Sequence, residues 1–213
     1  MRRSATFAAL ALAAVSPWAV ALDRGATPPV PAGAYTLDKP HTSLIFRVSH
    51  MTFSSFTGRF TNIAAKLDFD PVHLANSRVS VTIDPRSISS DNAPSGFLEM
   101  LSGKDWLGAE QFPQITFRSK SIDVTGANTL RIRGELTLHG VTRPITLDAS
   151  YNGGYAGQPM DPHARIGVSA RGKFKRSDFG VSIGIPAPGS NLGVGDEVEM
   201  VFESEFTGPP LAQ

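Results

Sequence analysis

The fold of this chain is decided by residues 136–147, which read Leu136-Thr137-Leu138-His139-Gly140-Val141-Thr142-Arg143-Pro144-Ile145-Thr146-Leu147. Leu136 and Leu138 alternate with polar residues, and the same alternation resumes with Ile145 and Leu147 after His139-Gly140. A period of two is typical of strands with one buried face, and Gly140 favours a tight turn between them. Pro144 stands near the start of the second strand, where a missing N–H is tolerated. The stretch therefore predicts an antiparallel β-hairpin.

The same period of two recurs through most of the chain. Apolar and polar residues alternate in the ranges 44–50, 63–70, 79–84, 115–117, 130–135, 166–170 and 198–206. One apolar and one polar face, strand after strand, indicate an antiparallel sheet that is closed into a barrel or stacked as a sandwich. The range 92–111 is the exception, because its apolar residues follow a near-helical spacing. We expect one or two short helices there, lying across one end of the barrel.

The amino terminus has the pattern of a cleaved secretory signal peptide. Arg2 and Arg3 precede an apolar run from Phe7 to Val15, and Ala19-Val20-Ala21 offers the small residues that a signal peptidase requires. The run is too short to span a bilayer of about 30 Å. We therefore predict a periplasmic protein, divided into a signal peptide (1–21), an extended proline-rich leader (22–33), one barrel domain (34–207) and a flexible tail (208–213).

Composition excludes several classes of partner. Removing residues 1–21 takes away two arginines and no acidic residue, which leaves 18 basic and 19 acidic side chains. A balance this close to neutral argues against binding to nucleic acid and against a polybasic membrane patch. The chain has no cysteine, so a secreted domain must rely on its apolar core for stability. The remaining 192 residues are enough for such a core.

The five histidines predict neither a metal site nor a catalytic centre. His41 and His50 are nine positions apart, which puts them on opposite faces of a regular strand unless a bulge intervenes. No His-x-His motif, cysteine cluster or carboxylate pair accompanies them in the sequence, and no Gly-x-Ser-x-Gly motif marks a nucleophile. We predict that the protein is not an enzyme and that it holds no metal and no cofactor other than a bound lipid.

Two polar residues each have two interpretations. His50 follows Leu44, Phe46 and Val48 on one apolar strand face, so it is either a hydrogen-bonded core histidine or a polar group that meets the head group of a ligand. Arg143, beside the predicted turn, either bonds backbone carbonyls or a nearby carboxylate, or contacts an anionic head group.

Several segments together resemble the YceI-like family of lipocalin-like secreted proteins. In the order of the family they are His41–His50, Gly58–Phe60, Lys104–Leu107, Phe112–Phe117, Gly134–Pro144, Ser177–Val181 and Val194–Val198. The resemblance implies an eight-stranded antiparallel barrel whose long apolar cavity holds a polyisoprenoid chain, such as an isoprenoid quinone or a prenyl phosphate. The chain departs from the family in the loop Ser182–Leu192, which has two prolines and few charges.

We accordingly predict an all-β protein, an eight-stranded antiparallel lipocalin-like barrel with a short helical insertion capping one end. A barrel of about eight strands is just wide enough to fill itself or to hold one small ligand. Strand parity, together with the expected helical cap, assigns eleven residues to the ligand-binding wall: Phe46, Val48, His50, Phe97, Leu101, Trp106, Leu136, Leu138, Val168, Met200 and Phe202.

The predicted function is that of a periplasmic carrier for a long-chain polyisoprenoid or similar amphipathic lipid. Each CH₂ group moved from water into the barrel contributes ~0.8 kcal/mol, so an isoprenoid tail binds without a specific polar site. Two alternatives stay open: an accessory protein-interaction subunit of a membrane redox complex, and an enzyme acting on a lipidic substrate. The sequence also leaves open a homodimer and transient contact with a membrane or a membrane redox protein.

Overall fold

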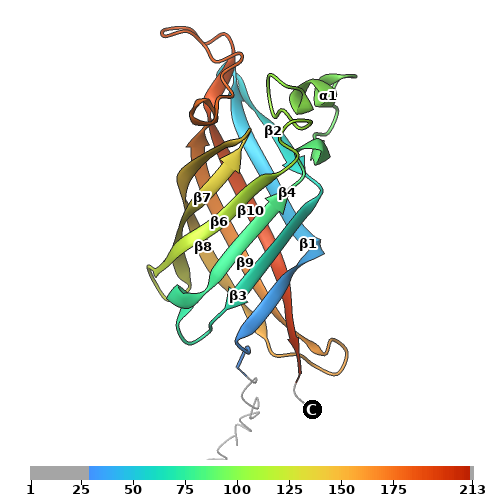
Figure 1. The fold of residues 1–213 in the computed structure, drawn as a ribbon, viewed down its shortest axis with the longest axis vertical. Helices are drawn as coiled ribbons and strands as arrows, with labels where there is room; N and C mark the ends of the chain where they lie inside the picture. Colours follow the sequence, from blue (N-terminus) through green and yellow to red (C-terminus); the bar gives the residue numbers. More distant parts are fainter. Residues whose placement is uncertain (1–28, 212–213) are drawn as a thin grey trace, which may run out of the picture.

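One antiparallel sheet, closed into a barrel, organises residues 29–211, which are the residues that the computed structural model describes (Figure 1). The predicted signal peptide lies outside the described residues. In chain order the strands and the α-helix are β1 (Gly33–His50), β2 (Ser54–Phe60), β3 (Ile63–Phe69), β4 (Arg78–Ile83), β5 (Ile88–Ser89), α1 (Phe97–Ser102), β6 (Ile115–Val124), β7 (Thr129–Leu138), β8 (Val141–Tyr155), β9 (His163–Lys175) and β10 (Val194–Pro210).

Eight of these strands form the wall of the barrel. Their order is β10-β9-β8-β7-β6-β4-β3-β1, and β1 also pairs with β10, which closes the ring. β1 changes its other partner along its length, because Gly33–Thr36 pair with β3 whereas Leu44–His50 pair with β2. β2 in turn pairs with the short β5. The predicted eight-stranded antiparallel barrel is therefore confirmed.

The predicted hairpin is formed by β7 and β8. They are joined by His139 and Gly140, whose φ angles of 51° and 75° are both positive, as a tight hairpin turn requires. The ring of Phe112 covers this turn, and a Cβ atom on Gly140 would lie 2.4 Å from it, so glycine is needed for space as well as for conformation. Ile145 and Leu147 are buried on β8, as the alternation predicts.

The predicted helical insertion is the segment that contains α1, at the upper end of the barrel in Figure 1. α1 is short, and the following chain folds back on it through backbone bonds from Leu107 N–H to the Leu101 carbonyl (3.1 Å) and from Ala109 N–H to the Ser102 carbonyl (2.9 Å). Only Leu101 of the helix is buried. Within residues 29–211 no helix is long and apolar enough to cross a membrane.

Large side chains fill the lower end of the barrel. The Tyr35 ring lies edge-on to Phe69, with ring centres 5.6 Å apart, and Phe69 stacks on Tyr151 at 5.8 Å. Ile166 and Phe206, both almost fully buried, complete this cluster. The Tyr35 hydroxyl donates to the Pro31 carbonyl (2.7 Å), and burial raises the pKa of Tyr35 to about 12. These residues, called the aromatic plug below, close this end of the barrel.

β10 continues to Pro210, three residues past the predicted boundary between the barrel and the tail. The physical reason is a close approach between Gly208 and the aromatic plug. A Cβ atom on Gly208 would lie 2.1 Å from the Tyr35 ring, so the ring lies directly on the backbone there. Pro210 still pairs with His163 of β9.

We expect Gly208→Ala to lower the free energy of unfolding by about 1–3 kcal/mol, the usual cost of overpacking a filled core. The added methyl group would displace Tyr35 from the aromatic plug. Urea denaturation measures the change. Gly167→Ala on β9 is the matched control, because its added Cβ atom would come no closer than 3.3 Å to the exposed Asn152. Equal stability of the two variants would contradict the packing described here.

Candidate ligand-binding cavity

A cavity of about 860 Å³ occupies the upper half of the barrel. Its walls are the inward faces of β1, β6, β7, β8 and β10, and the segment containing α1 covers part of its upper end. Phe117, Leu147 and Phe202 form its floor, because they also line a second space of about 70 Å³ that lies between the cavity and the aromatic plug. The cavity is thus closed below, and its exposed lining residues, among them His50 and Asp91, lie at the upper end.

The structure brings ten of the eleven predicted wall residues together around this cavity. They are Phe46, Val48, His50, Phe97, Leu101, Trp106, Leu136, Leu138, Met200 and Phe202. Val168 does not join them. It pairs with Tyr151 and Ser204 in the lower half of the barrel and lines the smaller space instead. The assignment of Val168 to the main cavity is therefore wrong, because parity fixes the face of a strand residue but not its height in the barrel.

His50 lies at the mouth of the cavity and is exposed. Its interpretation as a hydrogen-bonded core histidine is therefore wrong. The register explains the exposure, because His50 is the last residue of β1 and pairs with Val194, the first residue of β10. Other polar residues share the mouth with it, namely Ser54, Ser55, Thr57, Ser90, Asp91 and Asn92. Deep in the cavity the walls are formed by aliphatic and aromatic side chains.

One side of the mouth was not found by the sequence reasoning. β2 and residues 90–94 line it, and they connect to the helical segment through a row of aromatic rings. The ring centres of Phe46 and Phe56 are 6.0 Å apart, and Phe56 lies edge-on to Phe97 with ring centres 5.5 Å apart. β2 shows only a short alternation, and its serines resemble loop residues, so the only available signal was the spacing of its phenylalanines.

Arg176 is a buried cation in the cavity wall, and the sequence reasoning also missed it. Its side chain is 4% exposed and donates to four backbone carbonyls, those of Val181, Ile183, Val194 and Gly195, at 2.8–3.0 Å. Burial lowers the pKa of this guanidinium, and the charge of nearby Asp196 acts in the opposite direction. The guanidinium also lies 5.3 Å from the centre of the Trp106 ring. Arg176 therefore joins the two segments that form the rim.

Arg143 has a different role. Its Nε donates to the Asp178 carbonyl (3.2 Å), and the side chain lies outside the cavity lining. This confirms the interpretation in which Arg143 bonds a backbone carbonyl. Nearby, His139 contacts the Lys104 carbonyl (3.2 Å) and lies edge-on to Phe112. Both contacts attach the β7–β8 turn to neighbouring segments of the rim.

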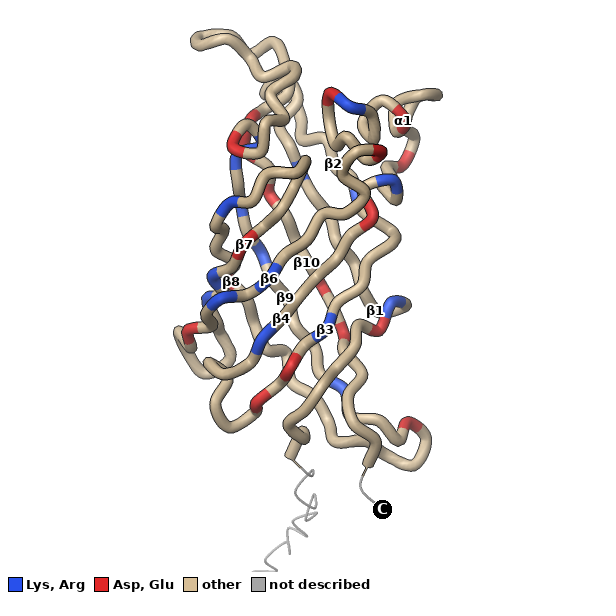
Figure 2. Tube along the Cα trace, viewed as in Figure 1, with Lys and Arg blue, Asp and Glu red and all other residues tan. Residues whose placement is uncertain are grey.

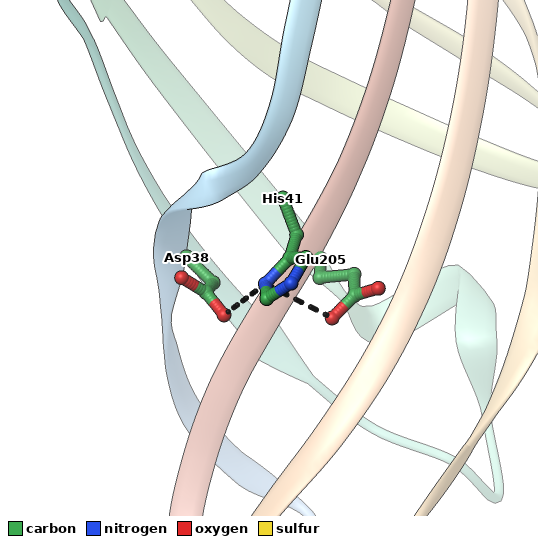
Figure 3. Close-up of side chains that lie close together, drawn as sticks. All are labelled: Asp38, His41 and Glu205. Carbon is green, nitrogen blue, oxygen red and sulfur yellow. Dashed lines mark hydrogen bonds and ion pairs between the residues drawn. The ribbon is translucent and has the colours of Figure 1, made fainter.

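A second group of polar side chains lies on the outer wall, near the lower half of β1. Figure 3 shows His41 between two carboxylates, with its Nδ1 atom 2.9 Å from Asp38 and 3.8 Å from Glu205. The sequence shows no such pair because the arrangement depends on a bulge in β1. Asp38 pairs with Glu205 and Ser43 with Glu203, so five steps along β1 match two along β10.

The ligand atoms of Asp38, His41 and Glu205 lie within 4.8 Å of one another, which is close enough to coordinate a metal ion. Arg165 already neutralises this group, because its guanidinium bonds Asp38 and Asp161 and lies 3.9 Å from Glu205. The arrangement thus acts as an ion-pair network that joins β1, β9 and β10. The absence of a bound metal stays a prediction.

The fold and the cavity define the class of protein: a closed eight-stranded antiparallel barrel of lipocalin type with an apolar interior that is closed at its lower end. The family model described as the YceI-like domain matches residues 35–206. The chain belongs to the YceI-like family, which confirms the resemblance found in its motifs.

Individual relatives agree with this assignment. A UPF0312 protein of Vibrio cholerae is 32% identical over 154 residues, which cover 71% of this chain and 79% of that protein. The YceI protein of Campylobacter jejuni is 30% identical with a TM-score of 0.63, over 82% of this chain and 98% of that one. A polyisoprenoid binding domain from Saccharophagus degradans, implicated in plant cell wall breakdown, shares the fold at 16% identity, with a TM-score of 0.59 and the same coverage.

The ion-pair network predicts a pH dependence of stability. The hydrogen bond that His41 donates to Asp38 and the charge of Glu205 raise the pKa of His41 above its ordinary value, which is about 6.5 in an unfolded chain. A raised pKa in the folded state means that the stabilisation is complete below about pH 6.5 and is lost as the pH rises through the folded value. The contribution of Asp38 to stability depends on pH in the opposite direction, because its lowered pKa gives stabilisation that is lost in acid.

We therefore expect His41→Asn to lower the melting temperature at pH 5–6 and to have a smaller effect in alkaline solution. Thermal unfolding of both proteins across this range measures the difference. In a background carrying Asp38→Asn and Glu205→Gln, the same substitution should lose its pH-dependent effect. A difference that instead grows as the pH rises would contradict the assigned role of His41.

Proposed function

We propose that the protein is a carrier that holds the tail of one long-chain polyisoprenoid, or of a similar amphipathic lipid, in the barrel cavity. The observation that carries the proposal is the blind apolar cavity of about 860 Å³. Small-molecule sites are usually concave, mostly apolar spaces of about 300–1,000 Å³ with a few placed polar groups, and this cavity fits that description.

The energetics of an unfilled cavity support a ligand. An apolar surface left without packing partners loses the contacts that stabilise a filled core, and the loss grows with the volume left unfilled. Water can enter through the mouth, but it finds few hydrogen-bond partners against aliphatic and aromatic walls. An apolar chain gains ~0.8 kcal/mol for each CH₂ group that it buries there.

The distribution of polar groups favours an amphipathic ligand with a fixed direction. The floor at Phe117 and Phe202 is apolar, whereas His50 and the serines of β2 surround the mouth. A tail would lie against the floor, and a head group would meet these hydroxyl and imidazole groups. An isoprenoid quinone or a prenyl phosphate has this form, and Arg176 adds a positive charge near the mouth that favours a carbonyl or anionic head.

The amino-terminal pattern supports a secreted protein, and we propose the periplasm as the place of action.

Among the described residues, the titratable groups that line the cavity are His50, Asp91 and Arg176. Arg176 uses its donors on backbone carbonyls, and Asp91 bonds Arg59 at the exposed rim. This arrangement favours binding over catalysis, and we propose the lipid itself as the only bound cofactor.

Native mass spectrometry of the purified protein, followed by solvent extraction, tests the proposal. We expect a bound species of several hundred daltons that extraction identifies as a polyisoprenoid. Met200→Trp should reduce the bound fraction, because the larger ring would take up part of the cavity. Its neighbour Val201 lies outside the cavity lining, so Val201→Trp is the control and should keep the ligand. A bare protein mass that persists after incubation with such lipids would contradict the proposal.

A further inference from the structure

The rim of the cavity carries a projecting surface without charges. Residues 181–195 contain no acidic, basic or histidine side chain, and neither do residues 51–58. Figure 1 shows the loop between β9 and β10 extending beyond the upper ends of the strands, and Figure 2 shows no charged residue on it. Residues 182–193 are called the rim loop below, and residues 51–53 the β1–β2 turn. The two are adjacent, because Met51 N–H donates to the Gly193 carbonyl (2.8 Å).

Large apolar side chains on this surface face water. Phe53 of the β1–β2 turn is 82% exposed, and Leu192 and Ile183 of the rim loop are 75% and 45% exposed. Met100, on α1 at the same end, is 46% exposed. Single exposed apolar residues are common in soluble proteins, but a group of them around the mouth of an apolar cavity marks an interaction site.

The exposure is built into the loop, because its two ends are held in place. Arg176 bonds the carbonyls of Ile183 and Val194, one at each end of the rim loop. Val194 N–H also donates to the Gly184 carbonyl (2.7 Å), which joins the ends to each other. The loop therefore presents Leu192 outward from a fixed base.

The lower end of the barrel offers an internal comparison. Val72 and Met160 are 79% and 95% exposed there, yet charged or titratable residues lie beside them in the sequence, among them Asp70 and Asp161. The aromatic plug also separates that end from the cavity. Exposed apolar residues thus occur at both ends, but Phe53, Ile183 and Leu192 lie in charge-free stretches of the chain beside the cavity mouth.

We propose that the rim loop and the β1–β2 turn dock on the surface of a lipid bilayer, so that the cavity mouth faces the membrane. The choice of a bilayer rests on the proposed function, because a long isoprenoid dissolves in membranes and not in water. Docking by the mouth would let the tail pass from the bilayer into the cavity without crossing bulk water. The ligand would therefore be exchanged at the membrane surface, through the docked mouth.

The shape of the surface favours a bilayer over a protein partner. A stable protein interface buries about 800 Å² on each side and has a polar rim that forms hydrogen bonds. Here the apolar residues lie on a short turn and a projecting loop, which suit insertion of individual side chains between lipid head groups. Loop backbone must stay hydrated, so only the side chains of Phe53, Ile183 and Leu192 would reach the acyl chains.

Vesicle flotation with neutral phosphatidylcholine vesicles tests the docking surface. We expect the purified wild-type protein to float with the vesicles, and the binding to change little between 0.1 and 0.5 M salt, because apolar burial carries it. The double variant Phe53→Asp with Leu192→Asp should bind at least tenfold more weakly. The matched control is Val72→Asp with Met160→Asp, which adds the same charge at similarly exposed sites of the lower end and should float like the wild type.

A second measurement, fluorescence quenching by lipids, does not depend on loss of binding in a variant and so is independent of a folding defect. Leu192→Trp should place an indole at the membrane interface, so brominated lipids should quench its fluorescence, whereas Met160→Trp should not be quenched. Failure of the wild type to float, or equal loss in the upper and lower double variants, would overturn the proposal. Lipid bound by the double variant from detergent solution would show that the cavity still works, so loss of docking and loss of ligand binding are distinguishable.

Discussion

The pairing of β1 with β10 is the constraint on which the rest of the structure depends. It closes the sheet and removes the open edges that a flat sheet would expose. It also sets the inward faces of the two strands against each other, since Leu44 pairs with Phe202 and Phe46 with Met200. The same register places His50 beside Val194 at the mouth. A slip by one residue would turn the cavity wall into outer surface.

Closure leaves an interior that the chain fills unevenly. The lower end is packed by the aromatic plug, and glycine at position 208 lets the Tyr35 ring lie against the backbone. The upper half keeps a cavity of about 860 Å³, which is lined by aliphatic and aromatic side chains in its depth and by polar groups at its mouth. Arg176, bonded to four carbonyls, fixes the rim that surrounds the opening. The asymmetry between a plugged end and an open end gives a bound chain its direction and gives the molecule one exposed apolar rim.

The sequence predicts the barrel well because a strand with one buried face alternates, and parity then identifies Phe46, Leu136 and Met200 as inward residues. Parity does not give the height of a residue along the barrel, which is why Val168 was misplaced. It does not locate the end of a strand either, so it cannot decide whether His50 is buried in the core or exposed at the mouth. Arg176 and the network around His41 depend on carbonyls and carboxylates that distant segments supply, and no local pattern records those contacts. Whether the wall residues bind a ligand is a question that parity alone cannot answer.

The central claim is that the blind upper cavity holds the tail of an amphipathic lipid. A crystal structure of the protein loaded with an isoprenoid quinone tests it most directly. The account predicts continuous density for an isoprenoid chain from the floor at Phe117 and Phe202 to a head group at the mouth, near His50. Density for the lipid outside the barrel, or a cavity closed by its own side chains in the presence of the lipid, would contradict it.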